Sequence, residues 1–326
     1  MKSISQHFRH APVMIRLPNW VGDVCMCLPA LRLLESSGVP YAVSARPWAR
    51  DLLSGMPLLD FVPATGKYLD DLKMLRQWHR AHPETERAIL MPDSFSTAII
   101  FRLAGFDAAG YRDDGRSLLL KWPVDKPVPR PHAVRSWFGL ALTALHRWNI
   151  APASSMPHDK LELTLTQTHK QHATQVMMDA GLGSTPFVLI APTAVGRHHG
   201  QIKVWPHFDV LTRRLQQLGL RVAMCPPPAE REAAKIAAPT ADLLDPLSPG
   251  AFCALTRLCA LVICNDSGVS HLSAAANARQ LTLFGVTDPA RTGPWTLNSV
   301  NLGQNGHWPA VDEVLQHTQQ ILSLHG

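Results

Sequence analysis

Short apolar runs alternate with amphipathic segments along most of the 326-residue chain. In the first half, residues 13–17, 41–45 and 88–91 are apolar runs of strand length. Residues 24–34 and 70–80 instead carry apolar side chains at helical spacing, three or four positions apart. Alternating strands and helices are typical of a parallel, doubly wound sheet. We therefore predict an α/β fold for this half.

The second half repeats the pattern. Residues 187–191, 221–225 and 261–264 are predicted strands, separated by segments with helical periodicity. Small residues and prolines cluster at residues 151–157, which we interpret as a linker. The sequence thus predicts two Rossmann-like domains, residues 1–155 and 156–309, facing each other across a cleft.

Composition narrows the class of protein. Hydrophobic residues make up 46% of the chain, which is typical of a packed globule. The first twelve residues lack the apolar core of a signal peptide, and no apolar run reaches the ~20 residues that span a bilayer. We expect a cytoplasmic protein.

The six cysteines stand in apolar contexts without a Cys-x-x-Cys pair, so we interpret them as structural thiols and predict no metal site.

Basic residues are concentrated in one segment. The chain carries 31 Lys and Arg against 25 Asp and Glu, a net charge of +6. Between residues 115 and 147, Asp125 stands alone against a set of basic residues, Arg116, Lys121, Lys126, Arg130, Arg135 and Arg147. Trp122 and Trp137 are interleaved. Such a segment suits a phosphorylated partner, an anionic lipid surface or nucleic acid, and a plain solvated face is the alternative.

The most informative stretch is Asn265-Asp-Ser-Gly268, which joins an apolar strand to an alanine-rich helical segment. A turn of small residues lets a ligand approach the backbone, and the free amides at a helix start favour an anion. Asp266, Ser267 and His271 would then surround a phosphate or an attached sugar. The alternative is an ordinary turn in which Asp266 caps the helix.

Two further segments of the second half reach the same strand ends. Thr193 follows the strand at residues 187–191, and Lys203 precedes Trp205. A hydroxyl, an ammonium and helix amides together could hold a pyrophosphate. A preorganised donor such as Lys203 is worth ~2.7–4 kcal/mol when charge develops on a departing phosphate. A surface lysine is the alternative reading.

In the first half, Asp23 stands at a glycine turn after the first strand. Crevices beyond the strand ends of open α/β sheets bind ligands, so this carboxylate is the best placed general base. It could also only cap the helix. No Asp-x-Asp motif stands near these turns, so stabilisation of a leaving group would fall to protein groups.

Three ordered motifs resemble glycosyltransferase family 9, the ADP-heptose lipopolysaccharide heptosyltransferases. They are Pro18-Asn-Trp-Val-Gly-Asp23, Lys203-x-Trp-Pro206, and Asn265-Asp-Ser-Gly-x-Ser-His271 with Phe284-Gly285 downstream. The first motif looks most like the heptosyltransferase II branch. The resemblance implies a GT-B fold and an inverting, metal-independent transfer without a cofactor. It also implies a last helix, within residues 310–326, that crosses back to the first domain.

The resemblance carries over to particular residues. Asp23 would be the base that deprotonates a heptose or Kdo hydroxyl, and Lys203 would assist catalysis and hold the donor diphosphate with Thr193. The remaining donor contacts would come from Glu230 at the ribose and from Asp266, Ser267, Gly268 and His271. The acceptor, the lipopolysaccharide core, would meet the first domain at Asn19, Trp20, Gly22, Arg116, Lys121, Arg130 and Arg135.

The same resemblance predicts a peripheral protein on an anionic membrane surface, at the inner face of the bacterial inner membrane. One departure concerns Pro226-Pro-Pro228, which stands where relatives usually have a glycine-containing turn. The alternatives are another GT-B enzyme with a different donor or acceptor, and a relative that binds nucleotide sugars without turnover. A nucleic-acid-binding regulator would leave all three motifs unexplained, so we predict no nucleic-acid partner.

Overall fold

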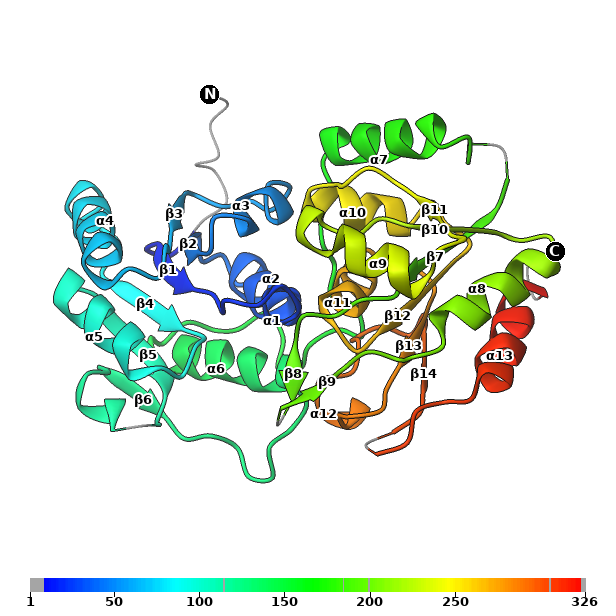
Figure 1. The fold of residues 1–326 in the computed structure, drawn as a ribbon. Coiled ribbons are helices and arrows are strands. Elements are labelled where there is room, and N and C mark those ends of the chain that lie inside the picture. The colour runs from blue at the N-terminus through cyan, green and yellow to red at the C-terminus, as the bar shows by residue number, and fades with distance from the viewer. Residues whose placement is uncertain (1–8, 114, 184, 199, 305, 324–326) are drawn as a thin grey trace. The chain divides into compact units, whose positions relative to one another are not determined.

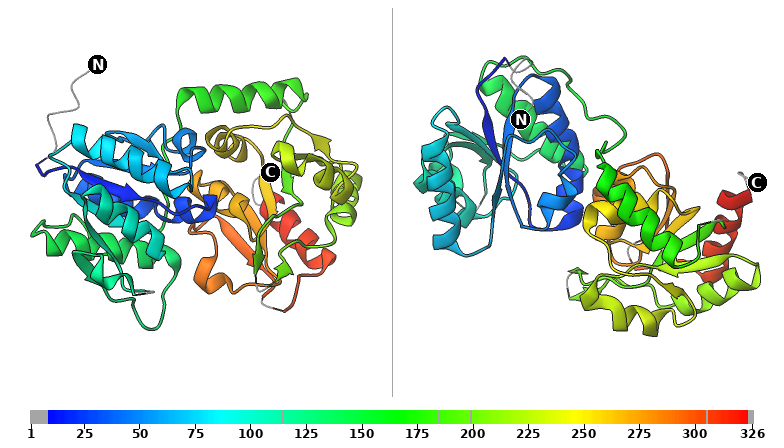
Figure 2. Two further views of the ribbon diagram at one scale, coloured as in Figure 1. Left: turned by 60° about the vertical axis from the view of Figure 1, so that its left-hand side comes forward. Right: turned by 90° about the horizontal axis from the view of Figure 1, so that it is seen from above.

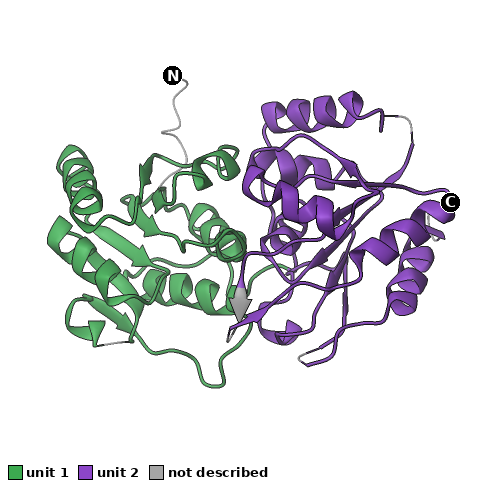
Figure 3. Cartoon of the chain, viewed as in Figure 1, with its two compact units in different colours: residues 1–158 green, residues 159–326 purple. Residues whose placement is uncertain are grey.

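The computed structural model describes residues 9–113, 115–183, 185–198, 200–304 and 306–323. The chain divides into two compact units, residues 1–158 and 159–326 (Figure 3). The division falls directly after the proline-containing segment at residues 151–157. The boundary proposed from the sequence lay between residues 155 and 156.

The described strands of the first unit form one parallel sheet in the order β3-β2-β1-β4-β5-β6 (Figure 1). These strands are β1 (Val13–Arg16), β2 (Tyr41–Ala45), β3 (Phe61–Pro63), β4 (Arg87–Leu90), β5 (Asp107–Tyr111) and β6 (Trp122–Val124). The helices are α1 (Val21–Met26), α2 (Leu28–Ser36), α3 (Ala49–Leu52), α4 (Tyr68–Ala81), α5 (Phe95–Ala104), the 3₁₀ turn η1 (Arg116–Leu118) and α6 (Ala133–Arg147).

Helices cover both faces of this sheet (Figure 2). Helix α2 packs against α6, and α4 packs against α5. Every residue of β1 and β2 is buried as a result. Strands buried on both faces read as continuous apolar runs, which is why the sequence predicts them. The sequence did not predict β5, because its Ala-Ala-Gly stretch has little strand propensity and is held by pairing with β4 and β6.

The second unit has the same architecture, with a described parallel sheet in the order β11-β10-β7-β12-β13-β14. Its strands are β7 (Phe187–Ala191), β10 (Arg221–Met224), β11 (Asp242–Leu243), β12 (Leu261–Asn265), β13 (Gln280–Leu283) and β14 (Ser299–Leu302), and a separate antiparallel pair is formed by β8 (Arg197–His198) and β9 (Gln201–Ile202). Its helices are α7 (Gln167–Asp179), α8 (Phe208–Gln217), the 3₁₀ turn η2 (Pro228–Glu230), α9 (Arg231–Ala237), α10 (Pro249–Thr256), α11 (Gly268–Ala275), α12 (Pro289–Thr292) and α13 (Val311–Ser323).

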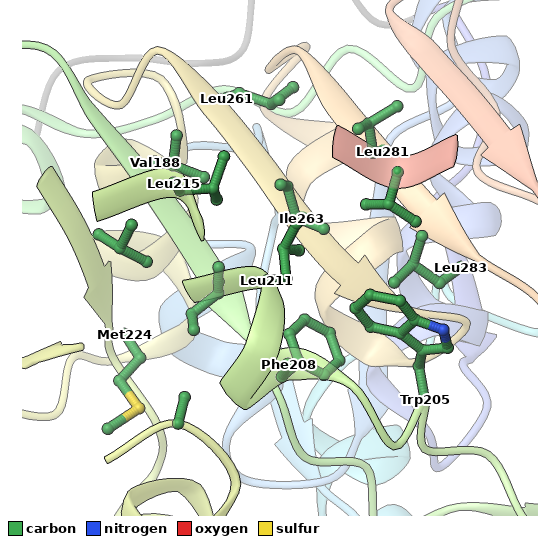
Figure 4. Close-up of a cluster of buried hydrophobic side chains, with 14 of the residues drawn as sticks. Val188, Trp205, Phe208, Leu211, Leu215, Met224, Leu261, Ile263, Leu281 and Leu283 are labelled. Atoms are coloured by element: carbon green, nitrogen blue, oxygen red, sulfur yellow. The ribbon is translucent and has the colours of Figure 1, made fainter. Parts of the chain in front are cut away.

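The core of the second unit is built around the central strand β12 (Figure 4). Ile263 of this strand packs with Leu211 of α8, and both are fully buried. Trp205 lies in the same cluster with 1% of its surface exposed. Its indole Nε1 donates to the carbonyl oxygen of Pro309 at 2.9 Å, which satisfies the polar end of a buried tryptophan.

Helix α13 packs within the second unit. Val314 and Leu315 belong to the core around β12, and the helix lies against α8. The hydrogen bond from Trp205 to Pro309 holds the segment that leads into it. The apolar face of α13 is covered by α8 and β12. The crossing of residues 310–326 back to the first domain stays a prediction. Residues 324–326 lie outside the described part of the chain.

The order of strands reverses once in each sheet. In the first unit the reversal lies between β1 and β4, and in the second between β7 and β12. At such a point the connections leave toward opposite faces of the sheet, so a crevice opens beyond the carboxyl ends of the two central strands. The Asp23 turn follows β1 and the Asp266 turn follows β12. Topology therefore places both at the ligand-binding edge of their sheets.

All six cysteines are free, and all but Cys259 are buried. Burial raises the pKa of Cys225 to about 11 and that of Cys264 to about 12. These thiols therefore stay protonated near neutral pH and are poor nucleophiles. Within the described residues, no helix has the length and apolar character needed to cross a membrane.

Candidate active site

Two adjacent residues at the end of β12 tie the second unit's site to its core. Asn265 is completely buried, and its Oδ1 accepts the backbone N–H of Trp205 at 2.8 Å. Its Nδ2 donates to the carbonyl oxygen of Ala191 at 3.2 Å, at the end of β7. One amide side chain thus joins three segments that are far apart in the sequence. Sequence reasoning had assigned no role to this side chain.

The next residue, Asp266, fixes Lys203. The Lys203 Nζ lies 2.9 Å from Asp266 Oδ2, with 19% and 5% of the two side chains exposed. Thr287, which follows β13, donates its hydroxyl to the same oxygen at 2.5 Å. A partly buried ammonium is thereby held at the carboxyl edge of the sheet, with a carboxylate compensating its charge. The sequence predicted Lys203 and Asp266 as site residues but did not identify Thr287.

Helix α11 begins directly beyond Asp266. Ser267 is its N-cap residue, and its Oγ accepts the N–H of Val269 at 3.3 Å. The helix start presents backbone amides and the positive end of the helix dipole. Gly268 and His271 are one helical turn apart, and His271 is 5% exposed. The alternative in which Asp266 only caps the helix is excluded, because Ser267 is the cap and Asp266 binds Lys203.

The two remaining predicted donor contacts also follow parallel strands of this sheet. Thr193 is half-buried and follows β7, which lies next to β12. Glu230 is half-buried at the end of η2, after β10, on the other side of β7. Pro226 and Pro227 lead into this 3₁₀ turn, and Pro228 is its first residue. The described residues contain no group of three His, Cys, Asp or Glu side chains arranged to hold a metal ion.

The first unit places the Asp23 turn at its own switch point. Asp23 is half-buried in the first turn of α1, beside the buried Gly22. Trp20 precedes this helix with 68% of its surface exposed, and Asn19 is also exposed. An acidic side chain, an exposed indole and an exposed amide therefore share the edge beyond β1. This arrangement can present a carboxylate to a polar ligand.

Residues 76–320 match the family model described as glycosyltransferase family 9 (heptosyltransferase). The chain belongs to glycosyltransferase family 9, the heptosyltransferases. The enzyme is 26% identical to the lipopolysaccharide heptosyltransferase 2 of Escherichia coli K12 over 311 residues, 86% of this chain and 85% of the relative. It is 25% identical to the lipooligosaccharide heptosyltransferase 2 of Haemophilus influenzae over 308 residues, 86% of this chain and 85% of the relative.

Solved structures show the same fold for this family 9 enzyme. The structure of the E. coli ADP-heptose lps heptosyltransferase II matches with a TM-score of 0.77 at 24% identity, covering 96% of this chain and 99% of the other. A family 9 structure from Veillonella parvula gives a TM-score of 0.82 at 14% identity over 99% and 100% of the two chains. E. coli heptosyltransferase WaaC with ADP gives 0.73 at 18% identity over 95% and 99%. The predicted GT-B class is confirmed.

The structure corrects the role expected of Arg116 in the family 9 enzyme. Its side chain is 0% exposed, and its Nη1 donates to the carbonyl oxygens of Pro92 at 2.6 Å and Ser94 at 3.3 Å. The guanidinium therefore holds the loop after β4 through two carbonyl oxygens. Because it is buried, it cannot act as an exposed acceptor contact. Gly110 makes this possible, because a Cβ there would lie 2.3 Å from Arg116 Nη2.

Lys121 lies at the edge of the sheet opposite the Asp23 turn. It directly precedes β6, and its Nζ lies 3.0 Å from the carboxylate of Asp107, which begins β5. Both residues stand at the amino ends of parallel strands, which is the edge opposite the Asp23 turn. The pair is more than a quarter exposed on each side chain, so it contributes little to stability. Strand direction separates Lys121 from that turn, and its acceptor role stays a prediction.

Arg130 and Arg135 remain at the ligand-binding edge. Both are exposed and follow the carboxyl end of β6, Arg130 in the loop and Arg135 in the first turn of α6. Val128, in the same loop, is 92% exposed. Nearby Lys126 contacts Asp93 at 2.7 Å and also pairs with Asp113. Burial lowers the pKa of Lys126, but hydrogen bonds to Asp113 and Asp93 outweigh this and raise it.

We expect Asn265→Ala to lower the free energy of unfolding by about 1–3 kcal/mol, because the buried N–H of Trp205 loses its acceptor. The measurement is denaturant unfolding followed by tryptophan fluorescence. Asn301→Ala, at an exposed position on the edge strand β14, is the matched control and should change stability by less than about 0.5 kcal/mol. Equal stability of the Asn265 variant and wild type would contradict the assigned role.

We expect Gly110→Ala to destabilise the first unit by about 1–3 kcal/mol, because the new Cβ meets a guanidinium held by two carbonyl oxygens. Gly139→Ala is the control. There a Cβ lies 3.8 Å from the hydroxyl of Tyr111, and alanine in a helix should stabilise by up to about 1 kcal/mol. Thermal unfolding of both variants measures the opposite signs, and a Gly110→Ala protein as stable as wild type would exclude the packing argument.

Proposed function

We propose that this family 9 enzyme transfers heptose from ADP-heptose to a sugar of the lipopolysaccharide core, with inversion at the anomeric carbon. The observation that carries the proposal is the arrangement of Lys203, Asp266 and the start of α11 at one switch point. An ammonium held in place, helix amides and the hydroxyl of Thr193, which follows the adjacent strand β7, suit a diphosphate. Relatives named lipopolysaccharide heptosyltransferase 2 and a structure of WaaC with ADP support this donor and acceptor.

Each site residue has a defined part in the proposed reaction. Asp23 removes the proton from an acceptor hydroxyl, and the resulting oxygen attacks the anomeric carbon of the heptose. The bond from that carbon to the diphosphate oxygen breaks, and ADP leaves with the electron pair. Lys203 and the amides of Ser267 and Gly268 stabilise the negative charge on the leaving diphosphate. The carboxylate then holds the proton that the acceptor lost.

The other predicted donor contacts recognise the rest of the donor. Glu230, after β10, would accept hydrogen bonds from the ribose hydroxyls. His271 would line the donor pocket one turn into α11. Asp266 acts mainly by holding Lys203, because its Oδ2 already accepts from Lys203 and Thr287. Donor profiling with several nucleotide sugars separates ADP-heptose from another donor, and binding without turnover would identify a non-catalytic relative.

Acceptor binding falls to the edge of the first unit that carries the Asp23 turn. Asn19, Trp20 and Gly22 lie at this edge, as do the exposed Arg130 and Arg135. Lipopolysaccharide core acceptors carry anionic groups and a lipid anchor, so exposed arginines beside the exposed Val128 suit both the acceptor and an anionic membrane surface. We therefore propose peripheral attachment at the cytoplasmic face of the inner membrane.

We expect Asp23→Asn to slow transfer by about 10²–10⁴-fold while ADP-heptose binding persists, because only the base is removed. The measurement is acceptor-dependent release of ADP, with heptose-deficient core lipopolysaccharide as acceptor and calorimetry for binding. Asp70→Asn is the control, since Asp70 is an exposed carboxylate on α4, and it should retain wild-type rates. No ADP release by the wild type would refute the proposed reaction.

We expect Arg130→Gln/Arg135→Gln to bind anionic vesicles about 30-fold more weakly, because each of the two basic residues near such a surface is worth about 1 kcal/mol. Co-sedimentation with vesicles of phosphatidylglycerol and phosphatidylcholine measures this. Lys73→Gln/Arg80→Gln is the matched comparison on α4, where exposed cations line a groove of about 640 Å³. A loss confined to the α4 variant would move the membrane contact to that helix.

A further inference from the structure

Arg16 is a buried charge at the head of the Asp23 turn. It is the last residue of β1, the strand that borders the switch point of the first unit. Only 8% of its surface is exposed. Burying a guanidinium costs free energy unless acceptors match its donors. The acceptors around Arg16 therefore show which segments it holds in place.

The guanidinium donates hydrogen bonds to two residues of the turn, Leu17 and Asn19. Its Nη1 donates to the carbonyl oxygen of the next residue, Leu17, and lies 3.4 Å from the carbonyl oxygen of Ser44 on β2. Its Nη2 donates to Oδ1 of Asn19 at 2.7 Å. The planar fork of arginine reaches these acceptors at once, which a lysine ammonium on a flexible stem does not reproduce. The turn between β1 and α1 is thereby fixed against β2.

Helix α1 depends on such external support. It has six residues, and its N-cap residue, Trp20, makes no side-chain capping hydrogen bond. Helices of this length are unstable alone, so their direction is set by the segments that flank them. Asp23 stands in the first turn of this helix. The orientation of its carboxylate therefore follows from the conformation of the four residues before the helix.

Two neighbouring charged side chains, those of Asp71 and Arg46, affect the pKa of Arg16. Burial lowers its pKa to about 10, with the carboxylate of Asp71 acting in the opposite direction and Arg46 adding to the lowering. The guanidinium is still charged at neutral pH. Asp71 itself accepts the N–H of Thr65 at 2.7 Å and that of Gly66 at 3.0 Å. The turn after β1 and the loop after β3 thus share one electrostatic environment.

We infer that Arg16 is a positioning residue for Asp23: by binding Leu17 and Asn19 it sets the direction in which α1 presents the carboxylate. This role rests on the proposed function of Asp23 as the base. Asn19, which was predicted to bind the acceptor, uses its Oδ1 for this contact. Arg16 is 8% exposed and acts on Asp23 through the turn.

The kinetic test compares Arg16→Lys and Arg16→Met with wild type, at a temperature where all variants are folded by circular dichroism. We expect kcat to fall by about 10–100-fold in both, because a small misplacement of a catalytic group has effects of this size. The donor KM and ADP binding should stay within about twofold. A third variant, Arg16→Ala, leaves space for a free guanidinium ion. Adding this ion at a non-denaturing concentration should restore part of the lost rate. A kcat within twofold of wild type for Arg16→Met would overturn the inference.

Arg46→Met is the matched control. Arg46 is a half-buried arginine on the same edge, and its guanidinium donates to the backbone of Thr65 and Ala64 instead of the Asp23 turn. We expect its kcat to stay within about threefold of wild type, well short of the loss expected for a misplaced base. A loss equal to that of Arg16→Met would show that any charge removed from this edge has the same effect, and would overturn the specific role.

A second readout does not require activity. Hydrogen exchange followed by mass spectrometry should show faster exchange in peptides covering residues 17–27 of Arg16→Met, with peptides of the second unit unchanged. Unchanged exchange in residues 17–27 would overturn the inference. If the wild type released no ADP, the proposed function would fail, while the exchange result would still decide whether Arg16 orders the turn.

Discussion

The contact of Asn265 and Asp266 with the segment at residues 203–205 is the interaction on which the second unit's site depends. Asn265 binds the backbone of Trp205, and Asp266 binds the ammonium of Lys203. Trp205 is part of the hydrophobic core, so the position of Lys203 is coupled to packing that involves no ligand. The buried tryptophan fixes the backbone near Lys203, and the ion pair with Asp266 holds the ammonium. This gives the site a preorganised cation without a rigid loop of its own.

In the first unit, the order of the strands in the sheet, and not a single side chain, sets the position of the site. Both sheets are parallel and reverse order once, and each reversal is followed by a short turn into a helix. In one unit the turn carries Asp23, and in the other it carries Asp266. Asp23 follows β1 and Asp266 follows β12, and each of these strands borders the reversal of its own sheet. One architecture therefore supplies a carboxylate at one sheet edge and an anion-binding helix start at another.

Basic residues illustrate why a charge count is a poor guide to a binding surface. The segment at residues 115–147 reads as a cationic face, but Arg116 is buried under the loop after β4 and Lys121 pairs with Asp107. Lys126 is likewise engaged by Asp93 and Asp113. Arginine can be buried when carbonyl oxygens match its donors, so its presence in a sequence does not imply exposure. Arg16, at the end of an apolar strand, is the same case.

The sequence by itself determined the fold class, the two repeated halves and the turns that carry Asp23, Lys203 and Asp266, because hydrophobic periodicity and small-residue turns are local signals. Tertiary structure alone decided the rest. The roles of Asn265, Thr287 and Arg16 depend on partners in other elements, β5 depends on pairing with its neighbours, and α13 packs where α8 leaves an apolar face open. Such contacts join residues far apart in the chain, and a linear pattern contains no record of which of them will meet.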